Sequence, residues 1–303
     1  MTTLLEDEHQ ALVTDPLDEI SQRTGDSSHQ VFSDWVDLTL ASFAGDEDAY
    51  QKPLTRYDNN GCEEDTVREL ATLHATALGG LVLAMEQTEE DVLGGVYEYY
   101  GLTSNRFAQY FTPGAVSRAM AAMNFPDNYD LRDATSEDPL VIGDISGCGS
   151  GRLIVDIAKR VRELDPEAPV VYVGYDKDPI CAKMAVLNFV LNDITGYVFL
   201  GDALKLDAHR AWFVSVAQLI RGDRPVRPLD TDERERVSNR FFGVPLDDTA
   251  TAMQEGEESP TEYPEDTVEA NEPSGVHSAG IEAELDVTLD SENTDQLGFD
   301  EFA

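Results

Sequence analysis

The chain has 303 residues and carries 60 acidic against 21 basic side chains, which gives a formal net charge of −39 at pH 7. Such a chain repels itself and nucleic acid in dilute buffer, whereas at molar salt a Debye length of about 3 Å screens most of that repulsion. We interpret the acidic, lysine-poor composition as a halophilic signature, and only secondarily as information about partners.

Several classes of protein are excluded by short features of the sequence. No apolar run reaches the roughly eighteen residues that span a bilayer, and the N-terminal "MTTLLEDEHQ" lacks the regions of a signal peptide. Cys62, Cys148 and Cys181 are odd in number and form no CxxC pair, which fits reduced thiols. The histidines show no metal-ligand spacing either. These features predict a cytoplasmic protein without a zinc or iron site.

The first third of the chain changes from a polar segment to helical periodicity. Residues 1–29 are polar and acidic, and we predict a disordered arm there. From Val31 onward, "VFSDWVDLTLASF", "TVRELATLHATALGGLVLAM" and "EEDVLGGVYEYYGL" repeat apolar residues at helical steps. The apolar face of the first of these helices comprises Phe32, Trp35, Val36, Leu38 and Phe43. We therefore expect a helical subdomain over residues 30–104.

The middle of the chain alternates short apolar runs with helical patterns. "PLVIGDI", "PVVYVGY" and "YVFL" are typical of buried strands, and "RLIVDIAKRVREL" and "DPICAKMAVLNFVLND" of the helices between them. Asp178 is the expected N-cap of the second helix, with Pro179 at its first position. "AWFVSVAQLI" fits a fourth strand or a helix. This order predicts an α/β fold, with a parallel sheet and right-handed crossovers over residues 105–240.

Acidic residues dominate the C-terminal segment. Residues 241–303 contain 18 Asp and Glu and no Lys or Arg. Such a segment cannot bury enough apolar area to offset the entropy lost on ordering, so we predict a disordered acidic tail. Before it, six arginines fall within residues 221–240, where interleaved acids favour a salt-bridged surface helix over contacts to DNA phosphates.

The last eight residues, "QLGFDEFA", form a separate motif. Gln296, Phe299 and Phe302 follow a Q-x-x-hydrophobic-x-x-aromatic spacing that resembles the sliding-clamp-binding peptide of replication and repair proteins. Such a peptide folds on binding and drives its apolar side chains into a pocket. Because Ala303 replaces a usual second aromatic residue, a chance match is the alternative interpretation.

A glycine loop stands between the first predicted strand and the helix that follows it. In "GCGSG", Gly147, Gly149 and Gly151 allow the backbone to approach a ligand closely, beside the free N–H groups of a helix N-terminus. The next two strands end in "GYDKD" and "GDAL", which place Asp176 to accept from ribose hydroxyls and Asp202 from an adenine amino group. The alternative is a tight turn with two capping aspartates. Three matches at consecutive strand ends favour a ligand site.

"QYFTPGAV", "CGSGRLI", "GYDKD" and "GDAL" resemble, in this order, the N6-adenine DNA methyltransferases of the type I restriction-modification kind. The resemblance covers roughly residues 31–205 and includes "DVLGGVYEYYGL" upstream. It implies a Rossmann-like class I methyltransferase core, S-adenosylmethionine as the cofactor, and DNA as a partner, bound directly or through another subunit. The G-x-G-x-G spacing is the form seen in these methyltransferases, and it disfavours a plain NAD-binding domain.

The resemblance also implies roles for individual residues. Phe111, Thr112 and Pro113 would line the cofactor pocket at the methionine end, and the glycine loop would hold the amino-acid moiety. The family usually has an aspartate three residues before the cysteine of "CGSG". Ile145 stands there in this chain, and Asp144 precedes it by one residue, so an insertion at Gly147 would restore the pattern.

The family's catalytic motif is not found in the sequence. Its members place Asn-Pro-Pro-Tyr/Phe after a fourth strand to hold a flipped adenine, whereas this chain contains no Pro-Pro at all. The catalytic residues are therefore unknown, and two interpretations stay open. The chain is either a divergent methyltransferase whose acceptor site uses other residues or a partner chain, or an inactive cofactor-binding adaptor that works through a partner methylase or a sliding clamp.

Overall fold

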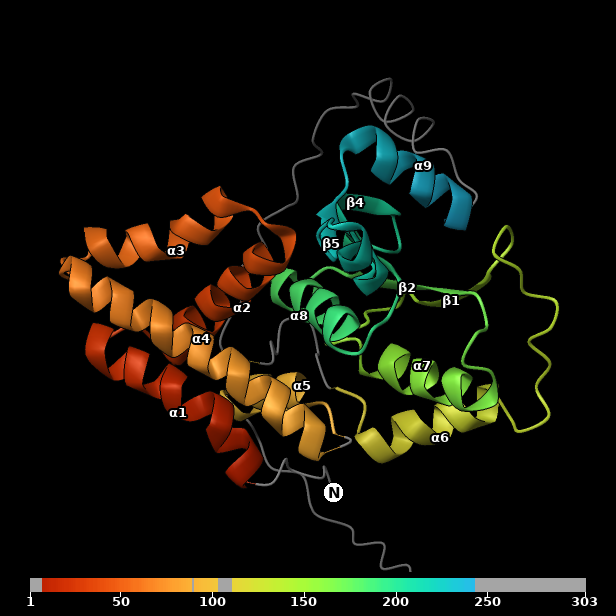
Figure 1. Ribbon diagram of the computed structural model, residues 1–303, viewed down its shortest axis with the longest axis horizontal. Helices are drawn as coiled ribbons and strands as arrows, with labels where there is room; N and C mark the ends of the chain where they lie inside the picture. The colour runs from red at the N-terminus through yellow and green to blue at the C-terminus, as the bar shows by residue number, and fades with distance from the viewer. Residues whose placement is uncertain (1–6, 89, 103–110, 243–303) are drawn as a thin grey trace, which may run out of the picture. The chain divides into compact units, whose positions relative to one another are not determined.

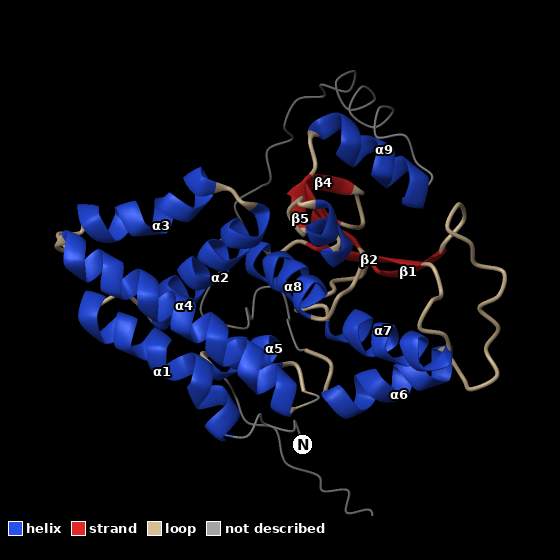
Figure 2. Ribbon diagram, in the orientation of Figure 1, coloured by secondary structure: helices blue, strands red, loops and turns tan. Residues whose placement is uncertain are grey.

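The computed structural model describes residues 7–88, 90–102 and 111–242 (Figure 1). Helices make up the first half of this part of the chain, and the strands of a sheet follow in the second half (Figure 2). The helices before the sheet are α1 (Asp7–Thr24), α2 (Ser28–Ala44), α3 (Glu47–Asn59), α4 (Glu64–Gln87), α5 (Val92–Tyr99) and α6 (Gly114–Asn124). Among the described residues, none of the helices has the length and apolar character needed to cross a membrane.

The sheet has five strands in the order β1-β2-β3-β4-β5. Its elements are β1 (Leu140–Asp144), α7 (Arg152–Leu164), β2 (Val170–Asp176), α8 (Pro179–Leu191), β3 (Gly196–Asp202), β4 (Asp207–Val214), a 3-10 helix (Val216–Arg221), β5 (Val226–Pro228) and α9 (Thr231–Phe242). The predicted strand–helix alternation is confirmed through β3. Asp178 caps α8 as predicted, with its carboxylate accepting from the N–H groups of Ile180 and Cys181.

The sheet is mixed: the predicted parallel pairing is confirmed for β1 to β3, and two antiparallel strands follow them. β1, β2 and β3 pair in parallel, but β4 is antiparallel to β3, and β5 is antiparallel to β4. Only residues 203–206 separate β3 from β4. A parallel neighbour needs a crossover of a dozen or more residues, so this short connection leaves only the antiparallel arrangement. The ambiguous "AWFVSVAQLI" thus forms the end of β4 and the 3-10 helix.

Helix α8 joins the two halves of the described chain. It packs against β2 and β3 on one side and against α2 and α5 on another. A helix that is apolar all round is buried on all sides, and α8 fits this rule because nine of its residues are buried, from Cys181 to Val190. The main hydrophobic cluster accordingly runs from Trp35 of α2 through Phe189 of α8 to Ile154 of α7.

The predicted disordered arm over residues 1–29 is wrong for residues 7–29. Helix α1 packs on α4, and its Val13, Leu17 and Ile20 are at most 1% exposed. These three residues are spaced as on one face of a helix. The apolar face is narrow and lies among acidic residues, so the overall composition of the segment did not indicate a helix. Ser27 then caps α2, its hydroxyl accepting from the N–H of Gln30 at 3.3 Å.

The predicted tail begins slightly too early. Helix α9 extends to Phe242, and the rings of Phe241 and Phe242 contact Tyr197 and Phe199 of β3, respectively. Residues 241 and 242 therefore belong to the fold, and the rest of the predicted tail, 243–303, lies outside the described residues. The predicted salt-bridged surface helix over residues 221–240 is confirmed only for 231–240, which belong to α9. Residues 226–228 form β5 instead, and Arg227 of this strand pairs with Glu233 of α9 at 2.6 Å.

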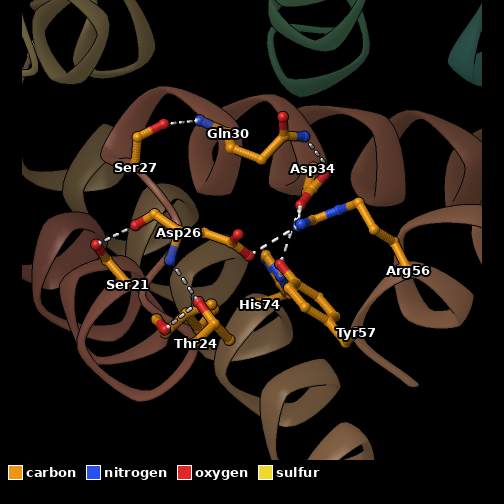
Figure 3. Close-up of polar contacts among 10 residues, drawn as sticks. Ser21, Thr24, Asp26, Ser27, Gln30, Asp34, Arg56, Tyr57 and His74 are labelled. Atoms are coloured by element: carbon orange, nitrogen blue, oxygen red, sulfur yellow. Dashed lines mark hydrogen bonds and ion pairs between the residues drawn. The ribbon is translucent and has the colours of Figure 1, made fainter. Parts of the chain in front are cut away.

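A buried polar network joins α2, α3 and α4 (Figure 3). The carboxylate of Asp34, 5% exposed, accepts from Tyr57 Oη at 3.1 Å and from the guanidinium of Arg56. Arg56 also donates to Asp26 at 3.0 Å. Tyr57 Oη lies 3.1 Å from Nε2 of His74, and burial, aided by the charge of Arg56, lowers the pKa of His74 to about 4. His74 is thus neutral in the folded protein at pH 7.

We expect His74 to make the fold less stable in acid. The unfolded chain binds this proton near pH 6.5 and the folded chain only near pH 4. The stability that the neutral imidazole contributes is therefore complete above about pH 6.5 and is lost as the pH falls toward 4. At pH 5 the loss is about 2 kcal/mol by the same linkage.

Urea unfolding at pH 7 and pH 5, in molar KCl, measures this loss. Between pH 7 and pH 5, the free energy of unfolding of His74→Gln should fall by about 2 kcal/mol less than that of the wild type. His29→Gln, a substitution at an exposed histidine of α2, is the matched control and should follow the wild type. Equal losses in the wild type and His74→Gln would contradict the assignment.

Candidate functional site

A cavity of about 360 Å³ lies at the carboxyl ends of β1, β2 and β3. Its volume is within the range of roughly 300–1,000 Å³ typical of small-molecule sites. The predicted cofactor residues that line it are Phe111, Gly147, Gly149, Asp176 and Asp202. Parallel pairing explains the convergence, because it brings the carboxyl ends of neighbouring strands to the same edge of the sheet.

The glycine loop touches the Phe-Thr-Pro step directly. Gly149 has a φ of +57°, and a Cβ placed on it would lie 2.7 Å from Cε1 of Phe111. Only a glycine therefore allows the ring to lie this close to the loop. Gly151 is left-handed as well, with a φ of +83°. A Cβ on it would meet Ala185 of α8 at 3.4 Å, so Gly151 serves helix packing rather than the cavity.

Asp176, at the end of β2, is the most constrained side chain of the cavity. It is 7% exposed, and its two oxygens accept from the N–H groups of Gly149 and Asp178, each at 2.8 Å. Burial raises the pKa of Asp176, the two backbone hydrogen bonds oppose that rise, and the charges of Asp178 and Asp144 add to it. A carboxylate has about four acceptor positions, so each oxygen can still accept from a ligand hydroxyl.

Asp202, at the end of β3, completes the polar lining. Its Oδ1 accepts from the N–H of Leu204 at 3.1 Å, and the side chain of Leu204 is 99% exposed beside the cavity. Two cysteines are close by, but burial raises the pKa of both the Cys148 and the Cys181 thiols. Thiols of this kind stay protonated and are poor nucleophiles. The cavity therefore offers binding groups and no activated cysteine.

Four predicted site residues do not line this cavity. Thr112 turns its carbonyl toward Arg152, which donates to it at 3.1 Å, and Pro113 is the N-cap of α6. Burial raises the pKa of Asp144, while hydrogen bonds from Ser146 oppose the rise. Together with Gly151, these residues hold the surrounding segments in place. Gln296, Phe299 and Phe302 of the predicted clamp peptide lie outside the described residues.

The sequence analysis did not identify the residues that hold the glycine loop without lining the cavity. Asp91 caps α5 and also accepts from the hydroxyl of Ser150, and Asn188 of α8 donates to the carbonyl of Ser150 at 2.8 Å. An aspartate before a helix is a recognisable capping signal. Its contact with a loop almost sixty residues away has no sequence signal. Within the described part of the chain, no group of three or more His, Cys, Asp or Glu residues is arranged to hold a metal ion.

A larger hollow of about 1110 Å³ lies between α2, α3 and β4. It contains Arg56 and Lys183, but each of them already pairs with an aspartate of α2. Both acidic and basic side chains line the hollow, among them Asp48 and Lys52. The hollow is therefore a weaker candidate than the cavity at the strand ends.

The direction of β4 determines at which edge of the sheet the residues that follow it emerge. Asp207, at its start, pairs with Asp202 at the end of β3, whereas Val214, at its end, pairs with Gly196 at the start of β3. The residues that follow β4 thus emerge at the edge of the sheet remote from the glycine loop. The segment in which the family resemblance implies the catalytic motif therefore does not reach the cavity.

The contact between Gly149 and Phe111 predicts a destabilising substitution. In Gly149→Ala, the left-handed φ alone costs about 1–2 kcal/mol, and the collision with the ring raises the total to about 3 kcal/mol. Gly25→Ala is the control, because Gly25 has a similar φ of +75° and no atom within 4 Å of its Cβ position.

Urea unfolding of the two variants separates strain from collision. Phe111→Ala, added to Gly149→Ala, should recover the part due to the collision. If Gly149→Ala and Gly25→Ala lose the same stability, the ring does not lie against the loop as described.

Comparison with known proteins finds a family and a relative that are similar to part of this chain. The family described as N-6 DNA Methylase matches residues 88–221. The type I restriction enzyme MjaVIII methylase subunit of Methanocaldococcus jannaschii is 27% identical over 143 residues, which are 45% of this chain and 22% of that protein. The match thus spans about a fifth of the length of the relative.

Two solved structures are similar to part of this chain. One, described as a class I S-adenosylmethionine-dependent methyltransferase of Listeria monocytogenes, has a TM-score of 0.41 at 14% identity and covers 65% of this chain and 55% of its own. The type I restriction-modification methyltransferase subunit of Streptococcus thermophilus has a TM-score of 0.30 at 15% identity, over 66% and 53%. Residues 88–221, which carry the cavity and strands β1 to β4, thus match the N-6 DNA methylase family.

Proposed function

We propose that the chain binds S-adenosylmethionine in the cavity at the strand ends and serves DNA adenine-N6 methylation together with a second chain. The observation that carries the proposal is the convergence of Phe111, the glycine loop, Asp176 and Asp202 on one cavity. These residues come from four separate segments, and all of them line the cavity. The second half of the proposal rests on the direction of β4.

The lining fits the chemical groups of this cofactor. Asp176 has free acceptor positions for the two ribose hydroxyls, and Asp202 for the adenine amino group. The glycine loop leads into the N-terminus of α7, where backbone N–H groups favour a carboxylate. The bound cofactor would supply a methyl group on a positively charged sulfonium, and the acidic lining suits that charge.

The acceptor side of the reaction supports the need for a second chain. A flipped adenine must be held by hydrogen bonds and stacking beside the cofactor. The described residues beyond Leu204 do not line the cavity, because β4 runs antiparallel to β3, and the sequence contains no Pro-Pro. The matched relative is called a methylase subunit, which favours an assembly. The alternative is a divergent methyltransferase that acts alone, and the clamp peptide at residues 296–303 stays a further prediction.

Asp176→Asn should weaken the binding of S-adenosylmethionine about ten- to a hundredfold. The amide replaces one acceptor oxygen by a donor, and two hydrogen bonds to a charged group are then lost or weakened. Calorimetry in molar KCl measures the dissociation constant, and thermal unfolding confirms that the variant is folded. The control is Asp58→Asn on the exposed end of α3, which should bind as the wild type does. Unchanged affinity in folded Asp176→Asn would count against the site.

The purified chain alone should not transfer labelled methyl from S-adenosylmethionine to unmethylated DNA in molar KCl. The reason is that no described residue after Leu204 lines the cavity. Cofactor binding is measured in the same sample, so an inactive preparation is distinguished from an incomplete enzyme. Incorporation of label at adenine would overturn the need for a second chain and would support the alternative of an independent methyltransferase.

A further inference from the structure

The glycine loop is held from two opposite sides by carboxylates. On the side of the cavity, Asp176 accepts from the N–H of Gly149 at 2.8 Å. On the far side, Asp91 accepts from the hydroxyl of Ser150. Ser150 is 1% exposed, and the residues on both sides of it are glycines with positive φ. Because glycines have the greatest backbone freedom, the contacts of Ser150 decide the orientation of the loop.

Asp91 belongs to a compact buried cluster. Its side chain is 6% exposed, and its Oδ1 accepts from Nδ2 of Asn188 at 3.1 Å. The same Asn188 nitrogen donates to the carbonyl of Ser150 at 2.8 Å. Ser150 is therefore fixed through both its hydroxyl and its carbonyl. Gly94 permits this arrangement, because a Cβ there would lie 2.2 Å from Oδ2 of Asp91.

The cluster extends to the other wall of the cavity through Arg152. Its Nε lies 3.8 Å from Oδ2 of Asp91, and its Nη1 donates to the carbonyl of Thr112 at 3.1 Å. Thr112 follows Phe111, whose ring covers Gly149. Asp91 thus connects the N-terminus of α5, the glycine loop and the Phe-Thr-Pro step. It is not itself among the residues that line the cavity.

We propose that Asp91 is a positioning residue for cofactor binding, which fixes the glycine loop through Ser150 and Asn188 without touching the ligand. The inference rests on the proposed function, because the ligand is S-adenosylmethionine. Pre-organising a loop in its binding geometry raises affinity by reducing the ordering cost of association. The loop is then ready before the ligand arrives, with its N–H groups in place.

Asp91→Ser separates this role from helix capping. Serine keeps a hydroxyl that caps α5 by accepting from the N–H of Gly94, but it is too short to reach Ser150 and Asn188. We expect the dissociation constant for S-adenosylmethionine to rise about tenfold or more, because the hydrogen bond from Ser150 to the charged carboxylate is lost. In the cofactor-free protein, the peptide of residues 146–152 should exchange its amide hydrogens faster. The melting temperature should change little.

Two further variants keep the test specific. Ser150→Ala removes the hydroxyl that Asp91 binds. The double variant, Asp91→Ser with Ser150→Ala, should bind S-adenosylmethionine as well as the single variant with the lower affinity does, since both substitutions remove the same contact. Asp46→Ser is the matched control, because Asp46 caps α3 in the same way, accepting from the N–H of Ala49 at 3.0 Å. It should leave both the affinity and the exchange of residues 146–152 unchanged.

The outcomes distinguish this inference from the proposed function. If the folded wild type fails to bind S-adenosylmethionine, the proposed function is wrong and the inference falls with it. If the wild type binds and Asp91→Ser matches it in both affinity and loop exchange, the positioning role is wrong and the cofactor site stands. A lower melting temperature with unchanged affinity would assign Asp91 to stability alone and would also overturn the inference.

Discussion

The parallel pairing of β1, β2 and β3 is the constraint on which the rest of the structure depends. It brings the glycine loop, Asp176 and Asp202 to one edge of the sheet. Parallel strands must be joined by long crossovers, and α7 and α8 supply them. Since α8 is apolar on all sides, it also needs a cover on its outer side, which α2 and α5 provide. The helical half is thus required by the sheet, and it places the cap of α5 next to the glycine loop.

The same sheet explains why the described residues after Leu204 do not line the cavity. Residues 203–206 are too few for another crossover, so β4 turns back along β3. Strand β1 lies at the opposite edge of the sheet from β5 and pairs only with β2 among the described residues. Consequently the cavity is built entirely from segments up to β3, apart from its neighbours in sequence at 203 and 204. Within the described residues, the cavity therefore has a wall on the side of the glycine loop and the strand ends, and none from the residues after Leu204.

Sequence reasoning succeeded where the signal was local. The helix caps, the glycine spacing and the strand ends can each be recognised from a few consecutive residues. The four predicted residues Phe111, Gly149, Asp176 and Asp202 do line one cavity. It failed where the decisive contact was distant. Helix α1 is stable because α4 covers its narrow apolar stripe, and composition does not reveal that partner. The contact between Asp91 and Ser150 joins two segments whose proximity follows from packing on α8.

The placement of the few cations shows how so acidic a chain holds its elements together. Arg68 pairs with acids of its own helix and is 68% exposed, so salt screens these pairs effectively. The least exposed cations join separate elements instead: Lys183 binds Asp37 of α2 with 14% exposure, and Arg152 reaches Glu90 and Asp91 with the same exposure. Partly buried pairs are screened much less than exposed ones. Molar salt therefore weakens the self-repulsion of the surface while the bridges around α8 and the glycine loop persist, so the cavity at the strand ends keeps its geometry.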